Sequence, residues 1–123
     1  MARRRIGESE GMAALRAVLD GHDDRQQVAT AVRYLLEELA ERAPGNTVEV
    51  RVAPYGATQC VAGPRHTRGT PANVIETDAA TWIALATGGL DWQTALTQGL
   101  VLASGVRADL QGLLPLVRQA WAS

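Results

Sequence analysis

The stretch TVEVRVAPYGATQCVA, residues 47–62, decides the fold class of this chain. Valines alternate with charged residues from Val48 to Val52, and this period of two is typical of a strand with one buried face. Pro54 and Tyr55 suit a tight turn, after which Gly56 leads into a second strand over residues 57–62. We therefore expect an antiparallel hairpin whose valine face is buried.

Two helices are expected before this hairpin. Apolar residues recur at helical spacing over residues 12–19. The next helix is predicted to begin at a cap formed by Asp23 or Asp24 and to end before Pro44. Its apolar stripe comprises Val28, Val32, Leu35, Leu36 and Leu39.

After the hairpin, residues 63–72 read as a loop and residues 73–76 as a short strand. Thr77 and Asp78 are the predicted cap of a helix that ends at Gly88 or Gly89, and Asp91 caps another that ends at Gly99.

The remaining residues are predicted to form a short apolar strand over residues 100–103 and then a terminal helix. Pro115 lies inside the helical pattern and predicts a kink or a fresh start near Leu114. The apolar stripe of this terminal helix would consist of Leu110, Leu113, Leu114, Val117 and Trp121.

Composition limits the classes of protein to which the chain can belong. Its 123 residues, 46% of them hydrophobic, predict a single domain over residues 1–123 with one core. A net charge of −1 disfavours nucleic-acid binding, which needs excess basic charge. The arginines at positions 3–5 precede glutamates rather than an apolar run, so they do not predict a secretion signal. No later apolar run is long enough for stable membrane insertion. We therefore expect a cytoplasmic protein, while its oligomeric state stays open.

Three segments carry a resemblance to a known family: DAATWIALATG at 78–88, ALTQG at 95–99 and LASG at 102–105. With the order of expected elements from residue 73 to 114, they resemble the C-terminal half of sterol carrier protein type two. The whole chain is similar to small stand-alone actinobacterial sterol-carrier-like proteins.

The resemblance implies an α+β fold in which helices cover one face of a mainly antiparallel sheet of four to five strands. It also implies an apolar cavity between sheet and helices, which in eukaryotic members accepts fatty acyl chains and sterols. Plain core packing is the alternative interpretation of the same apolar residues. The candidate lining residues are Trp82, Leu85, Leu96, Leu110, Leu113, Leu114 and Val117.

The loop before the third strand is the best polar candidate. Arg65, His66 and Arg68 lie there without a neighbouring carboxylate, which suits an anionic head group held by forked donors. The alternative is a solvated surface loop, or arginines paired with acids elsewhere.

No catalytic or metal-binding constellation is evident. Cys60 falls inside a strand and is expected to be an inert buried thiol, and His22 and His66 lie too far apart in sequence to suggest a metal site. We therefore expect no cofactor, no metal and no enzymatic activity. A binding or carrier domain for an apolar small molecule or lipid is the leading hypothesis. The alternative is an accessory or interaction domain with a filled core, like the sterol-carrier-like domain of actinobacterial thiol-dependent isomerases.

Overall fold

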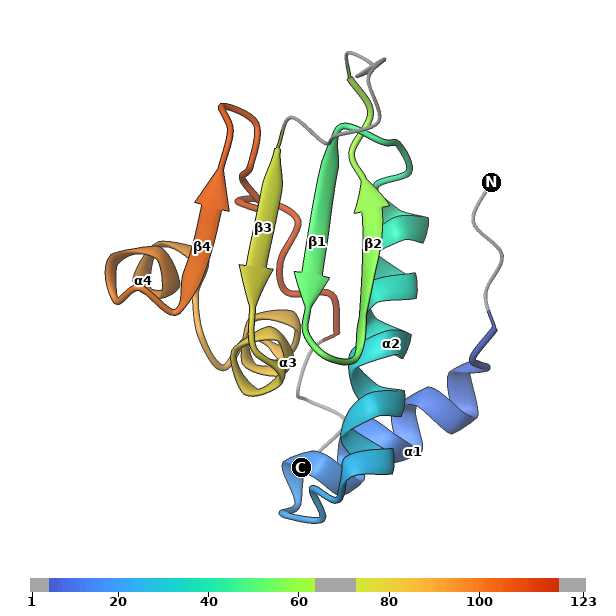
Figure 1. The fold of residues 1–123 in the computed structure, drawn as a ribbon. Coiled ribbons are helices and arrows are strands. Elements are labelled where there is room, and N and C mark those ends of the chain that lie inside the picture. Colours follow the sequence, from blue (N-terminus) through green and yellow to red (C-terminus); the bar gives the residue numbers. More distant parts are fainter. Residues whose placement is uncertain (1–4, 64–72, 118–123) are drawn as a thin grey trace.

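The computed structural model of the protein describes residues 5–63 and 73–117. Helices and strands follow one another along the chain in the order shown in Figure 1. The elements are α1 (Glu8–Leu19), α2 (Arg25–Arg42), β1 (Val48–Val52), β2 (Gly56–Cys60), β3 (Val74–Thr77), α3 (Ala79–Thr87), α4 (Trp92–Thr97) and β4 (Val101–Ser104).

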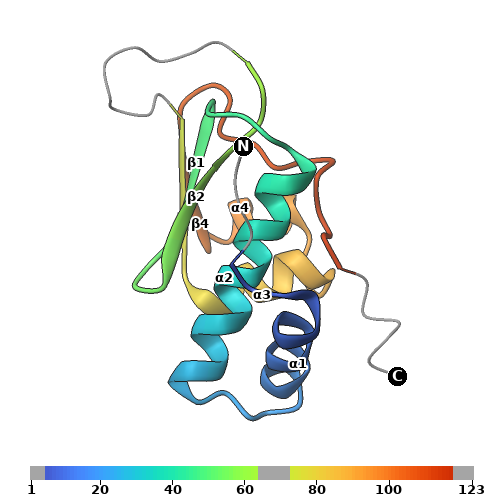
Figure 2. The same ribbon diagram turned by 90° about the vertical axis from the view of Figure 1, so that its right-hand side faces the viewer.

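The four strands form one mixed sheet in the order β2-β1-β3-β4. β1 is antiparallel to β2 and parallel to β3, and β3 is antiparallel to β4. Seen edge-on in Figure 2, the sheet has its helices on one side only. The expected α+β architecture, a mainly antiparallel sheet of four strands covered on one face by helices, is confirmed.

The hairpin has the predicted register, with Val48 opposite Cys60 and Val52 opposite Gly56. The valine face of β1 is fully buried, whereas the residues between the valines are only partly buried. β2 ends two residues earlier than expected because Val61 has a φ of +69°, which takes the backbone out of the extended conformation. Local alternation of apolar and polar residues therefore predicted both the pairing and the buried face.

Aspartates cap three of the helices. Gln27 N donates to the side chain of Asp24 at 2.9 Å, and Thr81 N donates to that of Asp78 at 2.7 Å. Asp91 accepts from the Thr94 amide at the start of α4. These caps satisfy amides that have no partner inside the helix, so each helix begins where its aspartate predicts.

The core lies between the sheet and α2, with α3 alongside α2. Trp82 of α3 is almost fully buried, and its indole Nε1 donates to the carbonyl of Val32 on α2 at 3.3 Å. α1 packs on the opposite side of α2 from the sheet (Figure 2). α2 is therefore the central layer of the molecule.

The predicted terminal helix is wrong within the described residues. After β4 the chain forms turns, not a helix, from Gly105 to Val117, and Trp121 lies outside the described residues. Gly112 has a φ of +88°, and Pro115 has no amide proton and disfavours helical backbone at the residue before it. Gly112 and Pro115 together therefore prevent a helix here, although the apolar residues have helical spacing.

Candidate functional site

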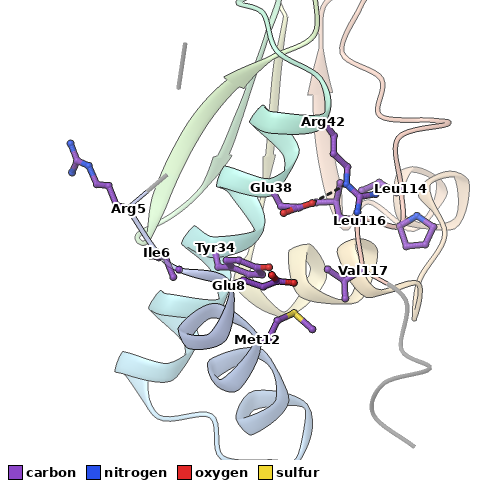
Figure 3. Close-up of a pocket in the computed structure, with 12 residues that line it drawn as sticks. Arg5, Ile6, Glu8, Met12, Tyr34, Glu38, Arg42, Leu114, Leu116 and Val117 are labelled. Carbon is purple, nitrogen blue, oxygen red and sulfur yellow. Dashed lines mark hydrogen bonds and ion pairs between the residues drawn. The ribbon is translucent and has the colours of Figure 1, made fainter. Parts of the chain in front are cut away.

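An open groove of about 1180 Å³ lies between α1, α2 and the segment 114–117. Figure 3 shows this groove in close-up, and we call it the helix groove. Its lining residues are Arg5, Ile6, Gly7, Glu8, Met12, Tyr34, Glu38, Arg42, Leu114, Pro115, Leu116 and Val117.

Hydrogen bonds hold both outer walls of the groove. On one side the carboxylate of Glu37 accepts from the amides of Arg5 at 3.3 Å and Ile6 at 3.2 Å. On the other side the amides of Leu116 and Val117 both donate to the carbonyl of Ala86, at 2.8 and 3.0 Å. The segments before α1 and after β4 are thus attached to α2 and α3 respectively.

The surface of the groove is amphipathic. Glu38 and Arg42, one turn apart on α2, form an ion pair with 3.0 Å between Oε2 and Nε. Met12 and Val117 extend into the groove from opposite walls, and Tyr34 lies on its floor between them and the ion pair (Figure 3). Aliphatic contacts and a charged pair in one groove suit a molecule with an apolar body and a polar end.

A second, smaller pocket of about 150 Å³ lies beside the helix groove, and the two share Leu114 and Pro115. We call it the Trp92 cavity, because Trp92 lines it and is 3% exposed. The indole Nε1 of Trp92 is buried and has no hydrogen-bond partner in the described part of the chain. The other lining residues are Leu85, Gly88, Leu90, Asp91, Leu110, Gln111 and Gly112.

The residues predicted to line one apolar cavity are divided among three places. Leu114 and Val117 line the helix groove, and Leu114 lines the Trp92 cavity together with Leu85 and Leu110. Trp82 is packed in the core, and Leu96 and Leu113 are half-buried against it.

Sequence reasoning missed the groove residues on the N-terminal side, chiefly Ile6, Met12 and Tyr34. No local pattern distinguishes them, because the groove forms only when α1 and the segment 114–117 approach the same part of α2. It also missed Trp92, which has the spacing of an ordinary core residue of α4.

The described residues give no support to the polar sites considered from the sequence. Arg65, His66 and Arg68 lie outside the described residues. Burial raises the pKa of the Cys60 thiol to about 11, so the thiol is protonated at neutral pH and is a poor nucleophile. Within residues 5–63 and 73–117, no three side chains of His, Cys, Asp or Glu gather as a metal site would require.

Among the described helices, none combines the length and the hydrophobicity of a membrane span.

Comparison with protein families places most of the chain in a known family. The family model described as "bacterial SCP ortholog" matches residues 24–116, from the cap of α2 to Leu116. The curated proteins contain no match. α1 lies before the matched region, so one wall of the helix groove is built from outside it. Because the model covers well over half of the 123 residues, the chain belongs to this bacterial family of sterol-carrier-protein-like domains.

Proposed function

We propose that this protein is a non-catalytic binding or carrier domain for an apolar small molecule, a fatty acyl chain or a sterol-like lipid. The observation that carries the proposal is an open groove, lined by both aliphatic and charged side chains, in a member of a sterol-carrier-protein-like family. We place the apolar part of the ligand in the helix groove. Of the lining residues predicted from the sequence, Leu114 and Val117 would contact it there.

The energetics predict how affinity depends on chain length. Each methylene group that leaves water contributes about 0.8 kcal/mol, less the cost of immobilising the chain. Affinity should therefore rise with the length of a saturated fatty acid until the groove is full, and then level off.

A titration of saturated fatty acids of increasing length, followed by calorimetry, tests this proposal. The variant Met12→Trp narrows the groove and should shorten the longest chain accepted. Ala13→Trp adds the same bulk to the exposed side of α1 and should leave the length dependence unchanged. Absence of saturable binding at every length below micelle formation would overturn the carrier function.

Two places could hold the head group of a fatty acid. Arg42 lies in the groove itself, whereas the sequence offers Arg65, His66 and Arg68. Arg42→Gln and the double variant Arg65→Ala, Arg68→Ala can be compared with laurate and dodecanol as probes. The variant that loses affinity for laurate and keeps its affinity for dodecanol identifies the carboxylate site.

An accessory or interaction domain is the second candidate. It is favoured by the packed core and by two exposed apolar side chains, Leu102 on the edge strand β4 (68% exposed) and Val106 just after it (99%). If no lipid binds, the interaction domain becomes the preferred function in place of the lipid carrier.

A further inference from the structure

A further pocket, of about 490 Å³, lies between α2, the start of β2 and the two residues Arg5 and Ile6. We call it the hairpin pocket, because the turn of the β1-β2 hairpin forms one of its walls. Its volume falls within the range of about 300–1,000 Å³ that is usual for small-molecule sites. Its lining residues are Arg5, Ile6, Arg33, Leu36, Glu37, Tyr55, Gly56, Ala57 and Thr58.

The guanidinium of Arg33 is held at this pocket by a backbone carbonyl. Its Nε donates to the carbonyl of Tyr55 at 2.7 Å, which joins α2 to the hairpin turn. The side chain passes Gly56 on the way, because a Cβ atom at Gly56 would lie 3.6 Å from the Cγ atom of Arg33. Since Tyr55 and Gly56 both line the pocket, these contacts place the guanidinium at its edge. Arg33 is exposed, so a ligand can reach it.

The two terminal nitrogens of this guanidinium remain available. Among residues 5–63 and 73–117, Arg33 makes no ion pair and no hydrogen bond besides the one to Tyr55. With Nε engaged, Nη1 and Nη2 are left as two donors in one plane. Such a fork matches the two oxygens of a carboxylate, which it can bind through two parallel hydrogen bonds.

The charge around the hairpin pocket favours an anion. Two arginines and one glutamate line it. The carboxylate of Glu37 accepts from the backbone amides of Arg5 and Ile6, at 3.3 and 3.2 Å, and is not paired with Arg33. Arg5 supplies the second positive charge, and in Figure 3 its side chain extends away from the helix groove. A ligand carboxylate would therefore meet a net positive charge.

Apolar surface makes up much of the remaining wall. Leu36 is buried, and Ile6 and Tyr55 are partly buried against the core. An inorganic anion would leave this surface in contact with water. An organic acid with an apolar ring would cover it while its carboxylate reached the arginine, and removal of apolar surface from water is favourable.

From these observations we infer that the hairpin pocket binds a small organic carboxylate with an apolar ring, and that Nη1 and Nη2 of Arg33 donate to its two oxygens. The inference goes beyond the proposed carrier function. It assigns a separate site to a ligand that is smaller than a lipid and has the opposite charge to the guanidinium that binds it.

The test uses benzoate and benzamide, which share a ring and a planar head group and differ in charge. In an NMR titration of the full chain, benzoate should bind about twofold to fivefold more tightly, as expected for an exposed ion pair. Acetate and inorganic phosphate, which lack the ring, should bind more weakly than benzoate. The amide signals of Gly56, Ala57 and Thr58 should shift during the benzoate titration, because these residues line the pocket.

Three variants locate the effect. Arg33→Gln removes the charge and the fork, so the preference for benzoate over benzamide should vanish. Arg33→Lys keeps the charge without the fork and should retain only part of the preference. Arg25→Gln makes the same change of charge at an exposed position of α2 outside the pocket, and should retain the preference in full.

The outcomes separate this inference from the proposed function. Equal affinity for benzoate and benzamide overturns the role of Arg33, as does an equal loss in Arg33→Gln and Arg25→Gln. Binding of acetate or phosphate as tight as that of benzoate overturns the choice of an organic acid. If fatty acids bind and benzoate does not, the inference fails and the carrier function stands. If benzoate binds as expected and fatty acids do not, the hairpin pocket stands without the carrier function.

Discussion

The ring of Tyr34 on α2 lies directly against the backbone of α1 at Gly11. A Cβ atom at Gly11 would lie 2.2 Å from the Cγ atom of the ring, far inside van der Waals contact. The absence of a side chain thus allows α1 to pack closely on α2 at the floor of the helix groove. The spacing of these two helices depends on one glycine.

Gly11→Ala should destabilise the protein by about 1–3 kcal/mol, the usual cost of overpacking. Helix propensity alone would have the opposite effect, because alanine is better than glycine by about 1 kcal/mol inside a helix. Ala13→Gly, at an exposed position of α1, measures that propensity in the same helix. Urea unfolding should show that both variants lose stability. Stabilisation by Gly11→Ala would mean that the ring moves aside freely.

Val50→Asp should be severely destabilising, by about 4 kcal/mol or more, because it buries a charge without a partner. Val50 is fully buried and lies between Thr58 on β2 and Ile75 on β3. Ala57→Asp, at an exposed position of β2, should cost about 1 kcal/mol or less. An unchanged melting temperature for Val50→Asp would contradict the register of the sheet.

Elements specified by local chemistry were predictable from the sequence. The alternation from Val48 to Val52 and the aspartate caps at Asp78 and Asp91 act over a few residues, and all appear as expected. The segment after β4 was not predictable in this way, because its apolar spacing favours a helix around Leu113 while Gly112 and Pro115 oppose one.

The candidate site was predictable only in part, for a related reason. Leu85, Leu110 and Leu114 were predicted to line an apolar cavity; the three line one pocket, and their contact with a ligand stays a prediction. The helix groove escaped prediction because Met12 and Val117 are far apart in sequence and meet only through tertiary packing. The unpaired indole of Trp92 has no sequence signal at all.

Cys60 should make stability depend on pH in the alkaline range. The folded state holds the pKa of its thiol at about 11, above about 8.5 in an unfolded chain. Because the thiol ionises more readily in the unfolded chain, the free energy of unfolding keeps its full value below about pH 8.5. It falls as the pH rises from there through about 11. The stability of the wild type relative to Cys60→Ala should therefore fall over this interval in urea titrations. A constant difference would contradict burial of the thiol.

Asp91 should make the stability of the protein depend on pH in the acidic range. Its pKa is lowered by hydrogen bonds from Thr94, so its contribution is present above the unfolded value near 3.9 and is lost as the pH falls through the lower folded value. The melting temperature of the wild type relative to Asp91→Asn should therefore decline below about pH 4. Thr94→Val removes the side-chain donor and should weaken this dependence. The same decline in Thr94→Val would assign the effect to other groups.

Alanine substitutions after β4 distinguish turns from the helix that the sequence suggested. A helical stripe would bury Leu110, Leu113 and Leu114 together, whereas the structure buries Leu110 and Leu116 and leaves Leu113 partly exposed. Leu110→Ala and Leu116→Ala should each cost about 2–5 kcal/mol, the range for truncating a buried leucine, and Leu113→Ala should cost clearly less. Leu116→Ala should also disturb the wall of the helix groove, because the side chain of Leu116 is buried in the segment that lines this groove. Thermal unfolding of the three variants ranks their losses of stability. A larger loss for Leu113→Ala than for Leu116→Ala would contradict the turns and support the predicted helix.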